Sequence, residues 1–469
     1  MPDTSSYNGL SLTPTMGWDN WNAFGCSVSE DLLLETAHSL VSLGLRDLGY
    51  TTVVLDDCWS SGRNETGHLV PDSDKFPNGM LHVANQLHAL GLKFGMYSSA
   101  GAYTCGRYPG SLGHEELDAQ TFAAWGVDYL KYDNCYNEGQ SGTPALSFAR
   151  YAAMARALSA TGRDIVYGIC NWGDDNPFDW AQTISNSWRM SGDIYDSFQR
   201  PDSRCPCTET PCDWPGYHCS VMNILNKMAP IQSRSQPGAF NDMDMLEVGN
   251  GGQSDSEYLT HISMWALLSS PLLIGTNIAT LSPRSLSLLS NPAILALNQD
   301  PSGTAGVRKW RHQVPDVDAD GQGEVALWTR ELANGDTAVA LLNAGNGSRV
   351  MRAGLGDVFL DQATAGAYEA PAELSQAWDV FDLWANRMSD EEAAAVIAGN
   401  SSEVAADSKT RYNATALPYA DGLAANHSAL VGQWVGRVQP GGSWEARIER
   451  HSVGVYRFRV ADGGERDEL

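Results

Sequence analysis

Residues 127–135, V-D-Y-L-K-Y-D-N-C, are the segment of this sequence whose residue types most directly suggest chemistry. The segment is a short apolar and aromatic run, typical of a strand, that ends in a carboxylate. Because residues two apart on a strand share a face, Tyr129, Lys131 and Asp133 are expected to point the same way. Lys and Asp are seldom fully buried unless they are paired. The segment alone therefore fits either a structural ion pair or a functional site at a strand end.

Other segments typical of strands also end in polar or acidic residues. Between about residue 12 and residue 300, eight such segments alternate with helical patterns, at 15–18, 52–57, 93–98, 127–133, 164–171, 187–193, 238–244 and 271–276. This alternation predicts an α/β fold, a (β/α)8 TIM barrel, whose active site lies at the C-terminal ends of the strands. A doubly wound sheet is the alternative, but no glycine-rich phosphate loop supports it.

Helix boundary signals fit this alternation. Ser29 can cap a helix whose apolar side chains recur at helical spacing and which Gly44 can end. Thr143 and Pro144 form a cap followed by proline at the first helical position. We therefore expect helices to start at both places.

The pattern changes after about residue 302. Segments 325–328 and 337–342 read as strands joined across Asn334-Gly335, a strong hairpin signal, and 444–460 alternates like another hairpin. We therefore predict a catalytic barrel over residues 1–302 and a C-terminal antiparallel β-sandwich over 303–469. Residues 399–430, rich in Ala, Ser and Asn, are expected to form an exposed, glycosylated connection.

The charge balance excludes some partners. The chain has 469 residues, with 56 Asp and Glu against 30 Lys and Arg, a net charge of −26. Nucleic acid and anionic membrane surfaces attract positively charged proteins, so neither is an expected partner. No stretch of 18 apolar residues predicts a membrane span. The sequence predicts no oligomeric state.

Several signals predict the secretory pathway or an extracellular location. The last four residues, Arg466 to Leu469, resemble the K-D-E-L retrieval address, and the alternative is a plain acidic tail. Residues 1–6 show no signal peptide. The N-x-S/T sequons, which are sites of glycosylation in a secretory lumen, start at Asn64, Asn346, Asn400, Asn413 and Asn426.

The nine cysteines fit the same compartment. Because loops after neighbouring strands emerge on one face of the barrel, the permitted disulfides are Cys26–Cys58 and Cys105–Cys135. Cys170 is left over as a free thiol. A C-P-C-x4-C-x6-C cluster could form two more disulfides, in any pairing. It could instead hold zinc, but its C-x-C opening and the secretory signals argue against a zinc site. Its members are Cys205, Cys207, Cys212 and Cys219.

The predicted strand ends supply carboxylates, aromatic rings, one Lys and one Arg. There is no H-x-H or H-E-x-x-H arrangement and no G-x-S-x-G elbow, so we expect no metal and no cofactor. Carboxylates accept hydroxyl protons, cations donate hydrogen bonds, and indoles stack on C–H faces, which suits an uncharged, polyhydroxylated substrate. Two carboxylates that face each other across a bond are what glycoside hydrolysis requires.

Five motifs, in order along residues 12–302, resemble glycoside hydrolase family 27, and within it the fungal and plant α-galactosidases, or melibiases. The resemblance implies a retaining exo-α-galactosidase that hydrolyses terminal α-D-galactosyl residues from galacto-oligosaccharides or galactomannan. The motifs are M-G-W-D-N-W-N at 16–22, L-D-D-C-W at 55–59, Y-L-K-Y-D-N-C at 129–135, S-W-R-M-S-G-D at 187–193 and F-N-D-M-D-M-L-E-V-G at 240–249.

The resemblance further implies that Asp133 is the nucleophile, which forms a covalent galactosyl intermediate, and that Asp193 is the acid/base. Lys131 on the same strand face should favour the ionised form of Asp133. In a retaining site the two carboxyl groups lie roughly 5 Å apart, so the charge of Asp133 should help Asp193 keep its proton. Once Asp133 is glycosylated that charge vanishes, and Asp193 can act as the base.

By the same resemblance, Asp56 and Asp57 accept hydrogen bonds from the 4- and 6-hydroxyls of galactose. The wrong epimer would leave a polar group unsatisfied there, at a cost of about 1–3 kcal/mol. The other substrate-binding residues that the resemblance implies are Trp21, Tyr97, Cys105, Lys131, Asn171, Trp172, Arg189 and Asp244.

Three alternatives stay open at this point. The first is an α-N-acetylgalactosaminidase, which would need small residues where Trp172 stands. The second is a β-L-arabinopyranosidase, which tends to change the acid that meets the 6-hydroxyl, and the third is a non-catalytic sugar-binding protein.

Two positions vary or stand apart within the family. Plant relatives often carry Glu at the position of Asn171. The insert 199–220 lies next to Asp193 in the sequence and could overhang the leaving-group side.

Overall fold

The computed structural model describes residues 7–200, 205, 218–319, 321–360, 371–399 and 409–461. Several sequence predictions fall wholly or mostly outside this part of the chain. They concern the sequon at Asn400, the cysteines Cys207 and Cys212, the overhang of the 199–220 insert, and the C-terminal residues 466–469.

The N-terminal part is built on eight parallel strands whose spatial order, β11-β8-β7-β6-β5-β2-β1-β12, follows the chain. The sheet curls until Leu246, which follows the edge strand β11, forms one isolated parallel bridge with Ile274 of the other edge strand, β12. Each strand overlaps one predicted strand, so the predicted barrel is confirmed. It is a curled sheet that is closed only by this one bridge. The strands are β1 (Met16–Asp19), β2 (Thr52–Leu55), β5 (Lys93–Ser99), β6 (Tyr129–Asp133), β7 (Val166–Cys170), β8 (Ser187–Arg189), β11 (Phe240–Asp242) and β12 (Leu272–Ile274).

Helices connect the strands of the barrel. Ser29 accepts a hydrogen bond from the backbone N–H of Leu32, and Thr143 accepts one from that of Leu146. Both predicted helix starts are therefore confirmed. The helices are α1 (Trp21–Phe24), α2 (Glu30–Ser42), α3 (Met80–Ala89), α4 (Glu115–Ala124), α5 (Pro144–Ala160), α6 (Val221–Met228), α7 (Asp255–Leu267), α8 (Pro283–Leu289) and α9 (Pro292–Asn298).

Short elements extend the loops at the strand ends. Strands β3 (Ser60–Arg63) and β4 (Leu69–Pro71) form an antiparallel hairpin, and β9 (Asp193–Ile194) pairs in parallel with β10 (His218–Cys219). The latter pair places the segment that precedes the 199–220 insert beside the end of that insert. The 3-10 helices of this part are η1 (Pro177–Asp179), η2 (Ala181–Thr183), η3 (Gln232–Arg234) and η4 (Ile278–Thr280).

The M-G-W-D motif forms β1 because its residues fit between two neighbouring strands. Trp18 is fully buried and donates its indole N–H to the Thr276 carbonyl at 2.8 Å. A Cβ at Gly17 would lie 2.0 Å from the carbonyl oxygen of Thr52 on β2, so only glycine allows the two strands to approach. The motif thus fixes the position of the residues that follow β1.

The C-terminal part is a β-sandwich, as predicted. Its larger sheet is antiparallel in the order β13-β14-β15-β20-β17-β18, and β16 pairs with β19 in a second sheet. Strands β14 and β15 are joined across Asn334-Gly335, which confirms that hairpin. The strands are β13 (Val307–Gln313), β14 (Glu324–Glu331), β15 (Thr337–Asn343), β16 (Arg349–Gly354), β17 (Trp378–Asp382), β18 (Gln433–Val438), β19 (Ser443–Ile448) and β20 (Ser452–Val460).

The hairpin predicted over 444–460 is wrong. Strands β19 and β20 both form, but β19 pairs with β16, whereas β20 pairs with β15 and β17. Alternation predicts a strand with one buried face, and both sheets of a sandwich offer such a face. The pattern therefore could not tell which strand would be the partner.

The segment 399–430 is only partly the exposed connection that we expected. Helices α12 (Tyr419–Ala424) and α13 (Ser428–Val431) form in it, and the Tyr419 hydroxyl donates to the Leu48 carbonyl of the barrel at 2.8 Å. Tyr412 and Leu430 are buried. A few spaced apolar side chains thus fix a segment whose composition is mostly polar. Helices α10 (Leu355–Phe359) and α11 (Asp390–Ile397) and the 3-10 helices η5 (Ala372–Ser375) and η6 (Trp384–Asn386) complete the C-terminal part.

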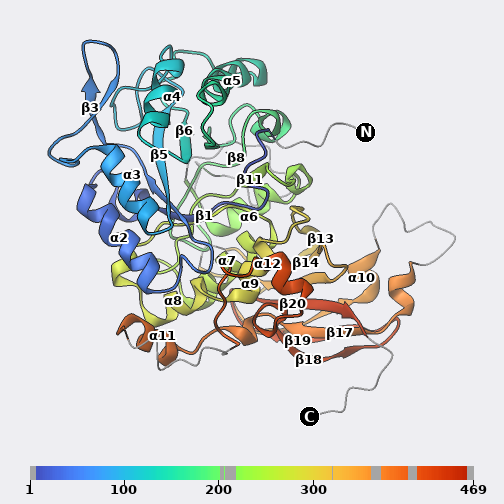
Figure 1. Ribbon diagram of the computed structural model, residues 1–469. Helices are drawn as coiled ribbons and strands as arrows, with labels where there is room; N and C mark the ends of the chain where they lie inside the picture. Colours follow the sequence, from blue (N-terminus) through green and yellow to red (C-terminus); the bar gives the residue numbers. More distant parts are fainter. Residues whose placement is uncertain are drawn as a thin grey trace.

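Figure 1 shows the orange and red C-terminal strands lying beside α7 and α9 of the barrel. Arg330 of β14 is buried there and donates to the carbonyls of Leu297 and Ala266 at 2.8 and 3.2 Å, near the ends of α9 and α7. We propose a domain boundary at 302/303, between α9 and β13. No helix among the described residues is both long and apolar enough to span a membrane.

Candidate active site

A cavity of about 680 Å³ opens at the C-terminal ends of the barrel strands. Of the twelve residues that the sequence predicted for the site, ten line this cavity. They are Trp21, Asp56, Tyr97, Cys105, Lys131, Asp133, Trp172, Arg189, Asp193 and Asp244.

Asp133 ends β6 and is held on several sides. Its Oδ2 accepts a hydrogen bond from the Tyr97 hydroxyl at 2.7 Å, and its Oδ1 accepts one from the backbone N–H of Asn134 at 2.8 Å. The sulfur of Cys105 lies 3.2 Å from Oδ2. Burial raises the pKa of the Asp133 carboxyl to about 7, although the charge of Lys131 acts in the opposite direction. Lys131 thus favours the ionised form of Asp133, as predicted, but burial has the larger effect on the pKa of Asp133.

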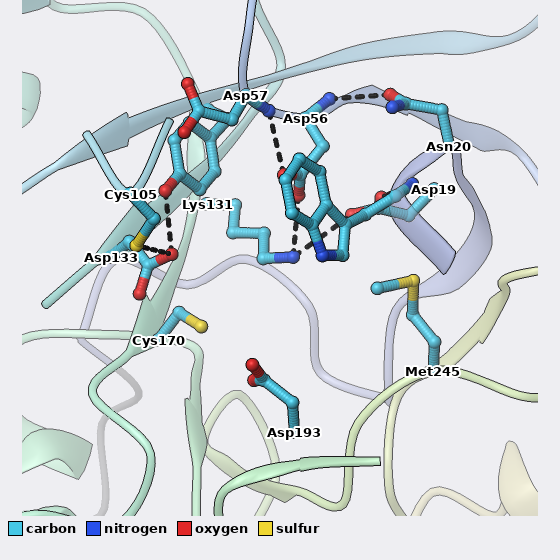
Figure 2. A network of polar contacts seen from close by, with 12 residues as sticks. Asp19, Asn20, Asp56, Asp57, Cys105, Lys131, Asp133, Cys170, Asp193 and Met245 are labelled. Carbon is cyan, nitrogen blue, oxygen red and sulfur yellow. Dashed lines mark hydrogen bonds and ion pairs between the residues drawn. The ribbon is translucent and has the colours of Figure 1, made fainter. Parts of the chain in front are cut away.

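Lys131 lies on the same face of β6 and binds two carboxylates. Its Nζ is 2.6 Å from Asp56 Oδ2 and 3.4 Å from Asp19 Oδ2. Figure 2 shows both contacts as dashed lines. Burial lowers the pKa of Lys131, but Asp19 and Asp56 together hold it well above the usual range. Asp19 is fully buried, and burial raises its pKa to about 8. Sequence reasoning noted Asp19 only as a polar strand end and missed its contact with Lys131.

Two predicted residues do not line the cavity. Asp57 accepts hydrogen bonds from the backbone N–H groups of Gly106 and Cys58 at 2.6 and 2.7 Å, so it holds the loop that carries Cys105. Asn171 is buried and donates to the Asp174 carbonyl at 2.6 Å. It shapes the turn in which Trp172 adopts a φ of 60°. Both residues support neighbours that do reach the cavity.

Arg189 lies between two carboxylates. Its Nη2 is 2.9 Å from Asp193 Oδ1 and 2.8 Å from Asp244 Oδ2. Asp244 also accepts a hydrogen bond from the backbone N–H of Ile194 at 2.8 Å, which fixes the segment that begins at Asp193. The Arg189 side chain is 4% exposed and that of Asp193 is 49% exposed. Arg189 therefore keeps a second anionic partner if Asp193 takes up a proton.

Asp133 and Asp193, sixty positions apart in the sequence, both line this one cavity. Figure 2 shows the Asp193 carboxyl group pointing towards the space beside Asp133 and Lys131. Two carboxyl groups in one hollow can supply an attacking oxygen and a proton donor. This is the pair of functions that hydrolysis of a glycosidic bond requires.

The cavity has further lining residues that sequence reasoning missed. Glu247 stands in the fifth motif but carried no prediction, because it follows the end of β11 by five residues. Cys170 was predicted only as a free thiol. In the structure, among the described residues, it is a buried cysteine that forms no disulfide. The other missed residues include Asn22, Tyr195, His218, Met245, Asn250, Asn277 and Thr280.

Disulfides join the loops around the cavity. The structure contains Cys26–Cys58 and Cys105–Cys135, the two pairings expected from neighbouring strands. A third disulfide, Cys205–Cys219, gives one of the pairings that the sequence left open. It closes the 199–220 insert beside β10.

The curled parallel sheet, with two carboxyl groups facing one cavity at its C-terminal end, defines the class of barrel glycoside hydrolases. Residues 13–300 match the family described as Alpha galactosidase A, and residues 322–408 match the Alpha galactosidase C-terminal beta sandwich domain. The chain belongs to the alpha-galactosidase family, glycoside hydrolase family 27.

Individual relatives are similar over almost their whole length. An alpha-galactosidase of Lachancea cidri is 55% identical over 457 residues, which are 97% of this chain and 95% of that protein. The solved structure of an alpha-galactosidase from Saccharomyces cerevisiae is 50% identical, with a TM-score of 0.93, over 98% of this chain and 100% of that one. A second structure of the Saccharomyces cerevisiae enzyme, with raffinose, matches over the same shares of both chains with the same identity and TM-score.

Proposed function

We propose that this chain is a retaining exo-α-galactosidase in which Asp133 is the nucleophile and Asp193 the acid/base. The observation that carries the proposal is that both carboxyl groups line one cavity beside Lys131 and Asp56. The names of relatives at 50–55% identity and the raffinose-bound relative support an α-galactoside as the substrate.

In the first step, a carboxylate oxygen of Asp133 bonds to the anomeric carbon of galactose as the glycosidic bond breaks. Asp193 gives its proton to the departing oxygen. Tyr97 and Asn134 hold the nucleophile's orientation through one hydrogen bond to each of its oxygens. Arg189 stays paired with Asp244 while Asp193 is neutral, so no buried guanidinium is left alone.

In the second step, Asp193 takes a proton from water, and the resulting hydroxide oxygen bonds to the anomeric carbon as the bond to Asp133 breaks. Two inversions at one carbon release α-galactose with its configuration kept. Asp193 regains its proton, and Asp133 regains its charge. Both carboxyl groups are then in the protonation states in which the reaction began.

Recognition of galactose rests on the residues at the end of the cavity near β2 and β6. Asp56 accepts from substrate hydroxyls and Lys131 donates to them, while Asp57 acts through the loop that carries Cys105. Trp21 stacks on the sugar ring. Trp172 occupies the space that an N-acetyl group would need, which favours galactose over N-acetylgalactosamine.

We also propose that the chain passes through the secretory pathway. Three disulfides support this, because they persist in oxidising compartments. The sequon residues that the structure describes, Asn64, Asn346, Asn413 and Asn426, are all exposed.

The direct test is release of nitrophenol from p-nitrophenyl α-galactoside by the wild-type chain and by Asp133→Ala. Equal release by both would leave only the sugar-binding alternative. Parallel assays with the α-N-acetylgalactosaminide and the β-L-arabinopyranoside test the substrate. A higher kcat/KM on either of these would overturn the assignment to galactose. NMR should show α-galactose as the first product.

A further inference from the structure

The backbone of Asp244 adopts a conformation that its surroundings must hold in place. Its φ is 77°, in the left-handed region that residues other than glycine seldom adopt, and such a conformation persists only where neighbouring groups fix it. Oδ2 of Asp244 contacts Arg189 and accepts a hydrogen bond from the backbone N–H of Ile194, and both of these groups lie beside the acid/base, Asp193. A group that holds Asp244 therefore also holds the two neighbours of the acid/base.

Trp265 of α7 bonds to this backbone from outside the catalytic cavity. Its indole N–H donates to the carbonyl oxygen of Asp244 at 2.8 Å, and its side chain is fully buried and does not line the cavity. The backbone N–H of Asp244 itself donates to Asp242, within the same turn. The bond from Trp265 thus ties this turn to a separate helix.

The indole of Trp265 has little freedom to move away from Asp244. The ring of His261, one helical turn earlier on α7, lies edge-on to it, with ring centroids 4.2 Å apart and planes at 68°. Both side chains are fully buried, and close-packed interiors leave few other rotamers open. The direction of the indole N–H is therefore fixed by packing as well as by its hydrogen bond.

Helix α7 is itself fixed along its length by the C-terminal domain. Four of its residues, spaced three apart and so on one face of the helix, bond to that domain at 2.6–3.2 Å. The pairs are Glu257 with His451, Thr260 with His451, Ser263 with Trp384, and Ala266 with Arg330. Loss of any one pair leaves three, so Trp265 reaches Asp244 from a rigid support.

We propose that Trp265 is a positioning residue for the acid/base. It acts through the carbonyl group of Asp244, whose carboxylate holds Arg189 and the backbone of Ile194 on either side of Asp193. The nucleophile has separate supports in Tyr97 and Asn134. The inference rests on the proposed function, because only a hydrolase uses Asp193 as a proton donor.

The test is Trp265→Phe, which keeps an aromatic ring and removes the N–H group, with kcat/KM measured on melibiose and on p-nitrophenyl α-galactoside. On melibiose, whose sugar leaving group needs a proton, kcat/KM should fall about tenfold from the loss of one buried hydrogen bond. On the nitrophenyl substrate it should fall less than about threefold, since nitrophenol departs with little help from an acid.

Trp328→Phe is the matched control. Trp328 is also fully buried, but in the described part of the chain its indole N–H has no hydrogen-bond partner. This variant removes the same atoms from a buried position without removing a hydrogen bond. Its kcat/KM should match that of the wild-type chain on both substrates.

Equal losses on the two substrates in Trp265→Phe would overturn the positioning role, because the change would then disturb the whole cavity. Unchanged kinetics on melibiose would overturn it too, as would a selective loss on melibiose in Trp328→Phe. If the wild-type chain released no nitrophenol, the proposed function itself would fail, which is a distinct result. If Trp265→Phe did not fold, benzothienylalanine at position 265, which keeps the two fused rings and lacks the N–H group, would decide.

Discussion

The Tyr97 hydroxyl donates a hydrogen bond of 2.7 Å to Oδ2 of Asp133. The two residues come from neighbouring parallel strands, β5 and β6, so the bond is built into the register of the sheet. It orients the carboxylate and favours its charged form, against the effect of burial. Tyr97 thus supports the nucleophile that the proposed mechanism requires.

Replacing Tyr97 by Phe should therefore lower kcat/KM on p-nitrophenyl α-galactoside by roughly 10- to 100-fold, since a hydrogen bond to a charged group is worth about 1.5–3 kcal/mol. The pKa of Asp133 should rise, so the acidic limb of the pH–rate profile should move to higher pH. The measurement is kcat/KM against pH for both chains. An unchanged acidic limb would mean that Tyr97 does not act on the nucleophile.

Lys131 offers a second prediction. It is the cation between Asp56 and Asp19, and all three side chains are largely buried. Lys131→Met should destabilise the fold by about 3–5 kcal/mol, because it leaves the buried carboxyl groups of Asp56 and Asp19 without their cation. Denaturant unfolding measures the loss. The double variant Lys131→Met, Asp56→Asn should recover part of it, and no recovery would contradict the pairing.

The buried carboxyl groups of the site predict how stability depends on pH. Burial raises the folded-state pKa of Asp19 and Glu247 to about 8, of Asp133 to about 7 and of Asp242 to about 6. Because the unfolded chain releases these protons near pH 4, these four groups bind fewer protons in the unfolded chain than in the folded chain between about pH 4 and 8. Stability should therefore fall as pH rises through that range.

The Tm should accordingly be higher at about pH 5 than at about pH 7.5. The comparison does not go below about pH 5, because two other carboxyl groups lose their stabilising effect in stronger acid. Hydrogen bonds lower their pKa values despite burial, from His451 to Glu257 and from Arg459 and Arg457 to Asp336. Asp242→Asn should flatten the slope. A Tm that increases with pH over this range would contradict the burial of these groups.

The contacts of Arg330 predict that the two domains stabilise each other. Its guanidinium donates to carbonyls near the ends of α7 and α9, where a cation is favourable. Arg330→Met should lower the free energy of unfolding by about 2 kcal/mol or more, since these hydrogen bonds involve a charged group. Activity at moderate temperature should be unchanged. A Tm equal to that of the wild-type chain would show that the contact is not stabilising.

The barrel was predictable from sequence because each of its parallel strands carries its own signal. A short apolar run with a polar end is visible at nearly every strand, and caps such as Ser29 mark the helices. The sandwich was less predictable. Strands β19 and β20 were found, but their pairing depends on which sheet buries each face, and alternation does not encode that.

The candidate site, too, was only partly predictable from the sequence. Residues at strand ends, such as Asp56, Lys131 and Asp133, reach the cavity because the fold places every strand end there. Asp57 and Asn171 stand at strand ends too, yet neither lines the cavity. Asp57 accepts a hydrogen bond from the backbone N–H of Gly106, and the Nδ2 of Asn171 donates one to the Asp174 carbonyl. Glu247 was missed because a loop brings it back to the cavity, and the path of a loop cannot be read from residue spacing.

Trapping the covalent intermediate tests most directly whether Asp133 is the nucleophile. A 2-fluoro α-galactoside with a good leaving group should react with the enzyme and then hydrolyse slowly, so that mass spectrometry of the digested protein can locate the bound sugar. The sugar should be bound to Asp133, and Asp133→Ala should carry no label. A label on another residue, or β-galactose as the first product with no labelled peptide, would contradict this assignment.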